Sequence, residues 1–137
     1  MRTSTCGLWP ARRGRPCLVA VLVDELGKPQ PPLRVGRTQE DARALLAMLD
    51  RSSPGCELVL PEWLAKSGDS ARLALEHGSV VWLVPAPILE AVQVVAHLAT
   101  GPPARTAAAL ARLPLAPALR AQLRRLTPPA RQQLTLL

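Results

Sequence analysis

Apolar residues in the first third of the chain follow the patterns of β-strands. Thr3 to Trp9 alternates small polar and apolar side chains, and Cys17 to Val23 is an uninterrupted apolar run typical of a buried central strand. The Gly-containing segment between them predicts a hairpin turn. Leu33 to Gly36, directly after Pro31 and Pro32, predicts a short third strand. We therefore expect three antiparallel strands at the start of the fold.

Helical spacing begins at Thr38, which is a suitable N-cap for the apolar residues that follow it. Because turns rich in Ser, Pro and Gly separate the apolar segments that follow, helices and strands are expected to alternate there. The expected elements are a helix over Gln39 to Asp50, a strand over Cys56 to Leu60, a helix over Lys66 to Glu76 and a strand over Ser79 to Val84.

Three more helices are predicted after the fifth strand. Pro85 and Pro87 suit the first turn of one helix, whose apolar stripe runs from Ile88 to Ala99. That stripe fits a dimerisation face and a helix packed on its own sheet equally well. Two short Ala/Leu/Arg helices, 105–113 and 117–126, should follow. The order β-β-β-α-β-α-β-α predicts an α/β fold with a mixed five-stranded sheet flanked by helices, and extra C-terminal helices.

With 137 residues the chain has the size of one domain. We expect an α/β domain over residues 1–112, with residues 113–137 forming a helix and tail packed on the same domain. No apolar run approaches the roughly 20 residues of a membrane span, and Met1 to Pro16 lacks the apolar stretch of a secretory signal. These features predict a cytoplasmic protein.

Cysteine and histidine do not form a recognisable site in the sequence. Cys6, Cys17 and Cys56 are too few for a disulfide framework and are predicted to be core residues. His77 and His97 have no Cys or carboxylate at zinc-ligand spacing, so no metal is expected there; they are interpreted as helix-end and helix-face residues.

Charge is distributed unevenly along the chain. All ten carboxylates lie between Asp24 and Glu90, whereas the segment from Ala91 onward holds six arginines and no acid. The planar guanidinium of arginine binds phosphate with two hydrogen bonds, so nucleic acid is a plausible partner. The predicted nucleic-acid-binding residues are Arg12, Arg13, Arg15, Arg105, Arg112, Arg120, Arg124 and Arg125. An arginine-rich composition that places Arg on any solvated helix face explains the same pattern equally well.

Several sequence segments carry a resemblance to a known fold. They are Cys6-Gly7-Leu8-Trp9 leading into Leu18 to Gly27, then Leu58-Val59-Leu60-Pro61-Glu62, then Gly78 through Pro85. In pattern and order, residues 3–112 resemble the RNase H-like fold, and within it the RuvC-like amino-terminal domain of DEDD-type insertion-sequence transposases. The resemblance implies two divalent metal ions held by carboxylates on the first strand, at the end of the fourth strand and on the helix after the fifth.

The chain departs from that family at the metal-binding positions. Trp9 stands at the first-strand Asp position, Pro61 or Glu62 at the fourth-strand Glu position, and Gly101 to Thr106, where the late aspartates fall, contains no acid. Because magnesium requires several oxygen ligands, no metal site is expected. Asp24 and Glu62 remain candidate catalytic carboxylates, with Mg²⁺ as cofactor, only if the chain is an active nuclease.

Three functions are therefore compatible with the sequence. The first is a catalytically degenerate, transposase- or resolvase-like pseudoenzyme that binds DNA or structured RNA through its arginine-rich ends. The second is a protein-interaction or assembly module whose Leu-rich C-terminal helices contact a partner or a second copy. The third is an active metal-dependent nuclease.

A platform of stacking aromatics is not expected, since Trp9, Trp63 and Trp82 are the only aromatic residues and are interpreted as packing residues. Of the three, Trp63 is placed where it could line a cleft at the carboxyl edge of the sheet.

Overall fold

A computed structural model describes residues 4–11, 17–67, 70–98 and 102–127, with side chains described outside 67 and 95–98. The strands are β1 (Thr5–Ala11), β2 (Cys17–Val23), β3 (Leu33–Val35), β4 (Glu57–Pro61), β5 (Val81–Val84) and β6 (Arg124–Arg125). The helices are α1 (Gln39–Ser52), α2 (Glu62–Ser67), α3 (Ser70–Glu76), α4 (Ala86–Leu98), α5 (Pro103–Arg112) and α6 (Pro117–Arg120), with a 3₁₀ turn η1 (Leu113–Leu115) after α5.

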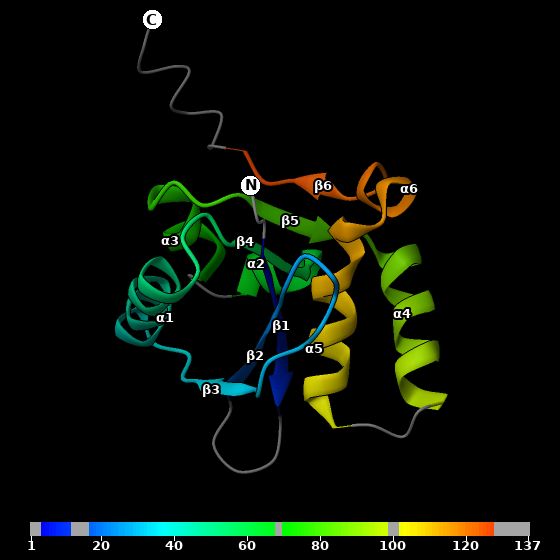
Figure 1. The fold of residues 1–137 in the computed structure, drawn as a ribbon, viewed down its shortest axis with the longest axis horizontal. Helices are drawn as coiled ribbons and strands as arrows, with labels where there is room; N and C mark the ends of the chain where they lie inside the picture. Colours follow the sequence, from blue (N-terminus) through cyan, green and yellow to red (C-terminus); the bar gives the residue numbers. More distant parts are fainter. Residues whose placement is uncertain (1–3, 12–16, 68–69, 99–101, 128–137) are drawn as a thin grey trace, which may run out of the picture.

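The strands form one mixed sheet in the order β3-β2-β1-β4-β5-β6 (Figure 1). β1 pairs antiparallel with β2, and β2 with β3, as the hairpin pattern predicts. β4 lies parallel to β1, and β5 parallel to β4. The predicted α/β class and the mixed sheet are confirmed, but the sheet has six strands and not the predicted five. The sixth strand, β6, pairs antiparallel with β5 and was not predicted.

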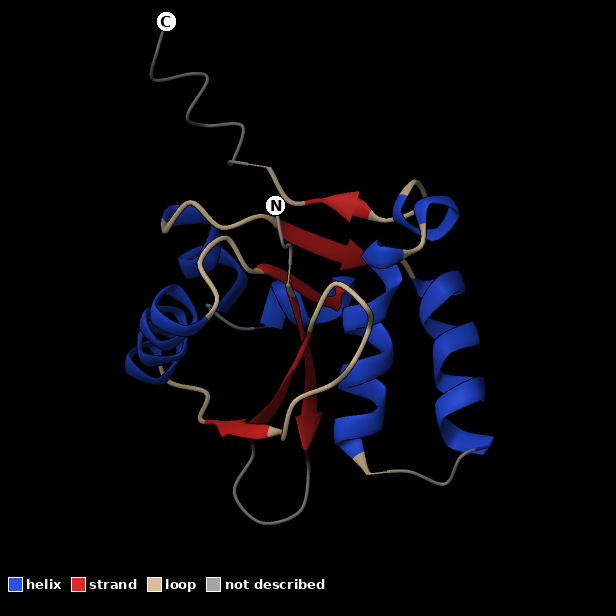
Figure 2. Ribbon diagram, viewed as in Figure 1, coloured by secondary structure: helices blue, strands red, loops and turns tan. Residues whose placement is uncertain are grey.

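Helices cover both faces of the sheet (Figure 2). Successive side chains of a strand point to opposite faces, so β1 directs Cys6 and Leu8 into the cluster packed under α1 and α3, and Gly7 toward α5. β2 is buried along its whole length, which explains its unbroken apolar sequence. The three cysteines are buried, as expected from the sequence.

Helix α5 approaches the sheet very closely at Gly7. A Cβ atom placed on Gly7 would lie 1.9 Å from the carbonyl oxygen of Ala107 and 2.9 Å from the backbone nitrogen of Ala111. Ala107 and Ala111 are fully buried, and the Thr5 hydroxyl donates a hydrogen bond to the Ala111 carbonyl oxygen. The helix backbone therefore rests directly on β1, where only glycine leaves room for it.

Two helix predictions were wrong in detail. The segment predicted as one helix from Lys66 to Glu76 consists of α2, which begins directly after β4, and α3; residues 68–69 between them lie outside the described residues. The helix predicted over 117–126 ends at Arg120, and the chain then joins the sheet. The backbone N–H of Leu126 donates to the Val81 carbonyl oxygen at 2.9 Å, so pairing with β5 overrides helix propensity there.

None of the described helices has the length and apolar character of a membrane span.

Gly7→Ala should destabilise the fold by about 3 kcal/mol, because the new methyl group would overlap the α5 backbone, which cannot move as a side chain can. Urea unfolding followed by tryptophan fluorescence measures the loss. Gly55→Ala is the control: its Cβ meets nothing within 4 Å, and only its φ of 77° opposes the substitution, at a cost of about 1 kcal/mol. Equal losses in the two variants would contradict the close contact at Gly7.

Candidate nucleic-acid interface

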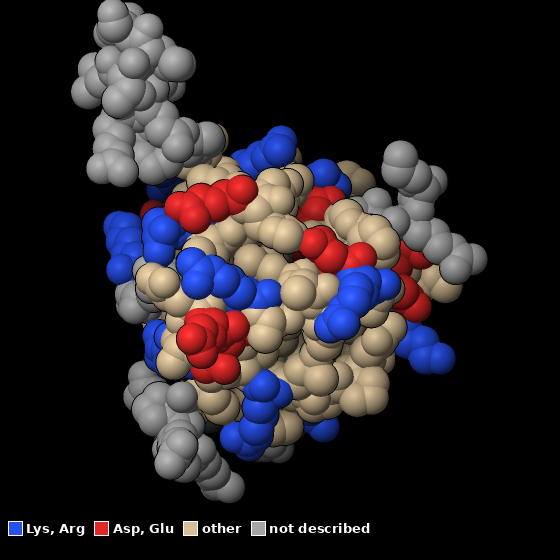
Figure 3. All heavy atoms as spheres, turned by 90° about the vertical axis from the view of Figure 1, so that its left-hand side faces the viewer, with Lys and Arg blue, Asp and Glu red and all other residues tan. Residues whose placement is uncertain are grey.

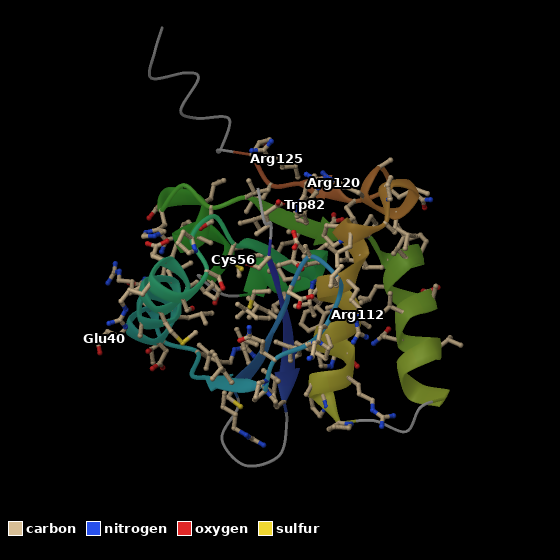
Figure 4. All side chains as sticks on the ribbon, viewed as in Figure 1. Glu40, Cys56, Trp82, Arg112, Arg120 and Arg125 are labelled. Atoms are coloured by element: carbon tan, nitrogen blue, oxygen red, sulfur yellow. The ribbon has the colours of Figure 1, made fainter. Side chains whose placement is uncertain are left out.

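The arginines of the C-terminal segment gather at the β5–β6 edge of the sheet. In the strand register Arg124 pairs with Leu83 and Arg125 with Trp82. Figure 4 places Arg120 next to Trp82 at this edge and Arg125 farther along the same edge. Leu123 is buried in the cluster under α4 and α5 and fixes the segment to the domain. The candidate interface is therefore held by both backbone pairing and packing.

Arg120 belongs to a small polar network at this edge. Trp82 donates its indole N–H to Oε1 of Glu57 at 2.6 Å, and the Arg120 guanidinium carbon lies 5.0 Å from the centroid of the Trp82 ring. Nη2 of Arg120 is 3.8 Å from the same Glu57 oxygen. Glu57 is buried, and a buried carboxylate requires a hydrogen-bond donor and an opposite charge. Arg120 and Trp82 supply these, so Arg120 has a structural role.

The remaining candidate arginines differ in their surroundings. Arg124 donates to Oε1 of Glu62 at 2.8 Å, and Arg112 donates through Nε to the Gly27 carbonyl oxygen at 2.9 Å. The latter bond joins α5 to the turn that follows β2. Arg105 lies on α5, and Arg125 is exposed on β6. Arg12, Arg13 and Arg15 lie outside the described residues.

Asp24 and Glu62, the candidate catalytic carboxylates, lie at opposite ends of the central strands. Asp24 follows the last residue of β2, which pairs with Thr5 at the start of β1, whereas Glu62 follows the end of β4, which runs parallel to β1. Oδ1 of Asp24 accepts hydrogen bonds from the backbone N–H groups of Leu26 and Lys28, both at 2.9 Å, so it organises a turn. The two carboxylates cannot hold a common metal ion, and the described residues contain no group of three potential ligands.

Trp63 and Trp9 meet at the carboxyl edge of the parallel strands. Their ring centroids are 6.1 Å apart and the rings are inclined at 76°, an edge-to-face contact. Trp9 is half-buried near the end of β1, Trp82 is buried, and Trp63, on the first turn of α2, is 45% exposed. The packing role expected for the tryptophans therefore fits Trp82 and Trp9 better than Trp63. The sequence signal for the exposure of Trp63 is its position directly after a strand end.

The other polar groups singled out in the sequence do not form an activated nucleophile. Nε2 of His77, just after α3, contacts Oδ2 of Asp50 on α1, and both side chains are substantially exposed. The hydroxyl of Ser52, the last residue of α1, donates to the Met48 carbonyl oxygen. The side chain of His97 lies outside the described residues. His77 is thus the helix-end residue that the sequence predicts, tied to the neighbouring helix.

Burial keeps two cysteines protonated. Desolvation raises the pKa of the Cys56 thiol from its ordinary 9.0 to about 11, and the nearby carboxylate of Glu57 adds to the rise, against a hydrogen bond to Ser4 that lowers it. Burial, and then the neighbouring Cys56, also raises the pKa of Cys6. Neither thiol is a nucleophile at neutral pH, since the reactive form is the thiolate.

The arrangement at the β5–β6 edge is suited to contact with phosphate groups, because Arg120, Arg124 and Arg125 are exposed there on neighbouring elements. No protein-family model matches the sequence, and no curated protein shows significant similarity to it.

Replacing Glu57 tests the polar network at the edge. Glu57→Leu would leave the Trp82 indole N–H without its acceptor, at a cost of about 1 to 3 kcal/mol in the free energy of unfolding. Glu57→Gln keeps an acceptor oxygen and should cost less than half as much. Urea denaturation of the two variants measures both values, and equal losses would show that the hydrogen bond does not stabilise the fold.

The raised pKa of Cys56 predicts a specific loss of stability in alkali. A group whose pKa is higher in the folded state stabilises the fold below its unfolded value, here 9.0, and this stabilisation is lost as pH rises toward about 11. From pH ~8.5 to ~10.5 the protein should lose on the order of 1 to 2 kcal/mol more than Cys56→Ala. Urea unfolding across this range provides the comparison, and parallel pH profiles would refute the role of Cys56.

Proposed function

We propose that this chain is a nucleic-acid-binding module of RNase H-like, transposase- or resolvase-like type that lacks the catalytic metal site. It binds DNA or structured RNA through phosphate contacts made by arginines, with the β5–β6 edge as the centre of the interface. Binding of this kind depends on charge and shape more than on base sequence.

The sheet supports the choice of fold. β1, β2 and β3 form two antiparallel pairs, and β4 and β5 continue the sheet parallel to β1 on its other side. The resemblance implies this mixed arrangement. At the metal-binding positions that it implies, β1 carries Trp9 and β4 ends in Pro61, and Glu62 next to it is paired with Arg124. These substitutions favour binding without metal-dependent cleavage.

The distribution of charge is the observation that carries the proposal. The segment from Ala91 to Arg125 contains five arginines and no carboxylate, and its described residues comprise the C-terminal part of α4 together with α5, η1, α6 and β6. The face that carries α1 and α3 differs, because acidic and basic side chains are interspersed there (Figure 3). Glu57 and Glu62 pair with Arg120 and Arg124 at the β5–β6 edge, and the other arginines of the segment add positive charge that attracts a polyanion.

Arg125 is the residue best placed to report on this interface. It is exposed on β6, while Arg120 and Arg124 also hold Glu57 and Glu62 and Arg112 holds the turn at Gly27. Substitution of the latter three would therefore remove intramolecular contacts as well as surface charge. Substitution of Arg125 changes the surface charge with little effect on packing.

Fluorescence anisotropy with duplex, branched and single-stranded DNA at two salt concentrations, with magnesium present, tests the proposal. The protein should bind at low salt, bind much more weakly at high salt because phosphate contacts release counterions, and leave the DNA uncut. Arg125→Glu should weaken binding about tenfold at low salt, which is ~1.4 kcal/mol. Arg43→Glu, the same change on the exposed side of α1, is the matched control and should leave binding nearly unchanged.

Each other outcome of the titration contradicts a stated part of the proposal. An absence of binding at low salt would refute it and favour the assembly module, in which the C-terminal helices contact a protein partner or a second copy. Magnesium-dependent cleavage would refute the loss of catalysis. Equal effects of Arg125→Glu and Arg43→Glu would refute the position of the interface.

A further inference from the structure

Trp63 is the exposed member of an aromatic pair at the carboxyl edge of the sheet. It is 45% exposed, while its neighbour Trp9 packs against the clusters on the α5 side of the sheet. The edge-to-face contact at 6.1 Å holds one side of the Trp63 ring in place. The exposed Trp63 indole is therefore already restrained by its contact with Trp9. Less side-chain conformational entropy of Trp63 is lost when a ligand binds to it.

Trp63 differs chemically from the other exposed apolar residues. Leu26, Leu33, Val94 and Leu119 are also exposed, but they are aliphatic and offer no π-face. A flat indole can stack on any nucleobase, and such stacking is tolerant of sequence. Trp63 is the described residue that combines exposure with this property.

Two basic side chains lie on or beside the helix that carries Trp63. Lys66 is exposed and lies three residues farther along α2, so it projects from the same side of the helix. Arg124 lies 2.8 Å from the carboxylate of Glu62, the residue that precedes Trp63. A base stacked on Trp63 would therefore have cations within reach of its flanking phosphates. This charge complementarity favours a nucleotide over an uncharged or basic apolar ligand.

We propose that Trp63 stacks on an unpaired base of the bound nucleic acid. The inference rests on the proposed function and adds a ligand class to it: DNA or RNA with at least one unpaired base beside a duplex, such as a single-stranded overhang or branch point, is bound in preference to blunt duplex. Phosphate contacts at the β5–β6 edge hold the duplex, and Trp63 supplies the preference for the unpaired base.

The test compares three probes with the same duplex: a blunt end, a short single-stranded overhang, and an overhang of equal length made of abasic sugar-phosphate units. The abasic probe has the same charge as the overhang but no base to stack. The protein should bind the normal overhang about tenfold more tightly than the abasic one, ~1.4 kcal/mol. Trp63→Ala should abolish this ratio, and Trp63→Phe, which keeps an aromatic face, should retain most of it.

Tryptophan fluorescence supplies an independent measurement. Stacking should quench the emission of Trp63 when the normal overhang binds, and this quenching should be absent in Trp63→Phe, in which Trp9 and Trp82 remain. Circular dichroism of both variants establishes that they are folded.

The result that overturns the stacking role is distinct from the one that overturns the proposed function. An unchanged preference for the normal overhang in Trp63→Ala, with Arg125→Glu still weakening binding to all three probes, refutes stacking and leaves phosphate binding intact. An absence of binding to every probe at low salt refutes both. A change in the oligomeric state of Trp63→Ala without DNA would show that Trp63 covers a protein surface, which also refutes stacking.

Discussion

The contact between α5 and β1 at Gly7 is the constraint on which the second half of the structure depends. The helix backbone occupies the space where any side chain at position 7 would lie, and the hydrogen bond from Thr5 to the Ala111 carbonyl oxygen ties down the end of the helix. Small residues on α5 make the approach possible, since Ala107, Ala108 and Ala111 are all buried there. From this fixed end the chain passes through η1 and α6 and reaches β5 as β6, so the position of the arginines follows from the packing of α5.

Most of the architecture can be predicted from local patterns. β1, β2, β4 and β5 are apolar enough to be recognised from their sequences, and the two prolines before β3 indicate where it begins. Helix α1 has a clear start, because Thr38 and Asp41 form a reciprocal capping box in which the Thr38 hydroxyl accepts from the Asp41 N–H at 3.1 Å. The sequence contains no comparable signal for β6, which consists of two exposed arginines. Its conformation comes from backbone groups of β5 that are far away in the chain.

The candidate interface was predictable only in part. The segregation of charge identifies the C-terminal arginines, but the sequence does not show that Glu57 and Glu62 pair with two of them across about sixty residues. These pairs distinguish Arg120 and Arg124, which are exposed but also contact an acid, from Arg125 on the same edge. In the same way, Asp24 and Glu62 both follow a predicted strand in the sequence. Because β2 and β4 run in opposite directions, the two residues lie at opposite ends of the strands.

The two edges of the sheet are both very short. β3 has three residues and β6 has two, and β6 carries consecutive arginines where an incoming strand would have to pair. Open strand edges recruit other chains into continuous β-structure unless they are brief, charged or covered. The apolar central strands β1, β2 and β4 would aggregate readily if they stood at a border, and they are instead enclosed on both sides. β6 thus covers Trp82 and Leu83 of β5 with a brief, charged strand, which disfavours edge-to-edge pairing with another chain.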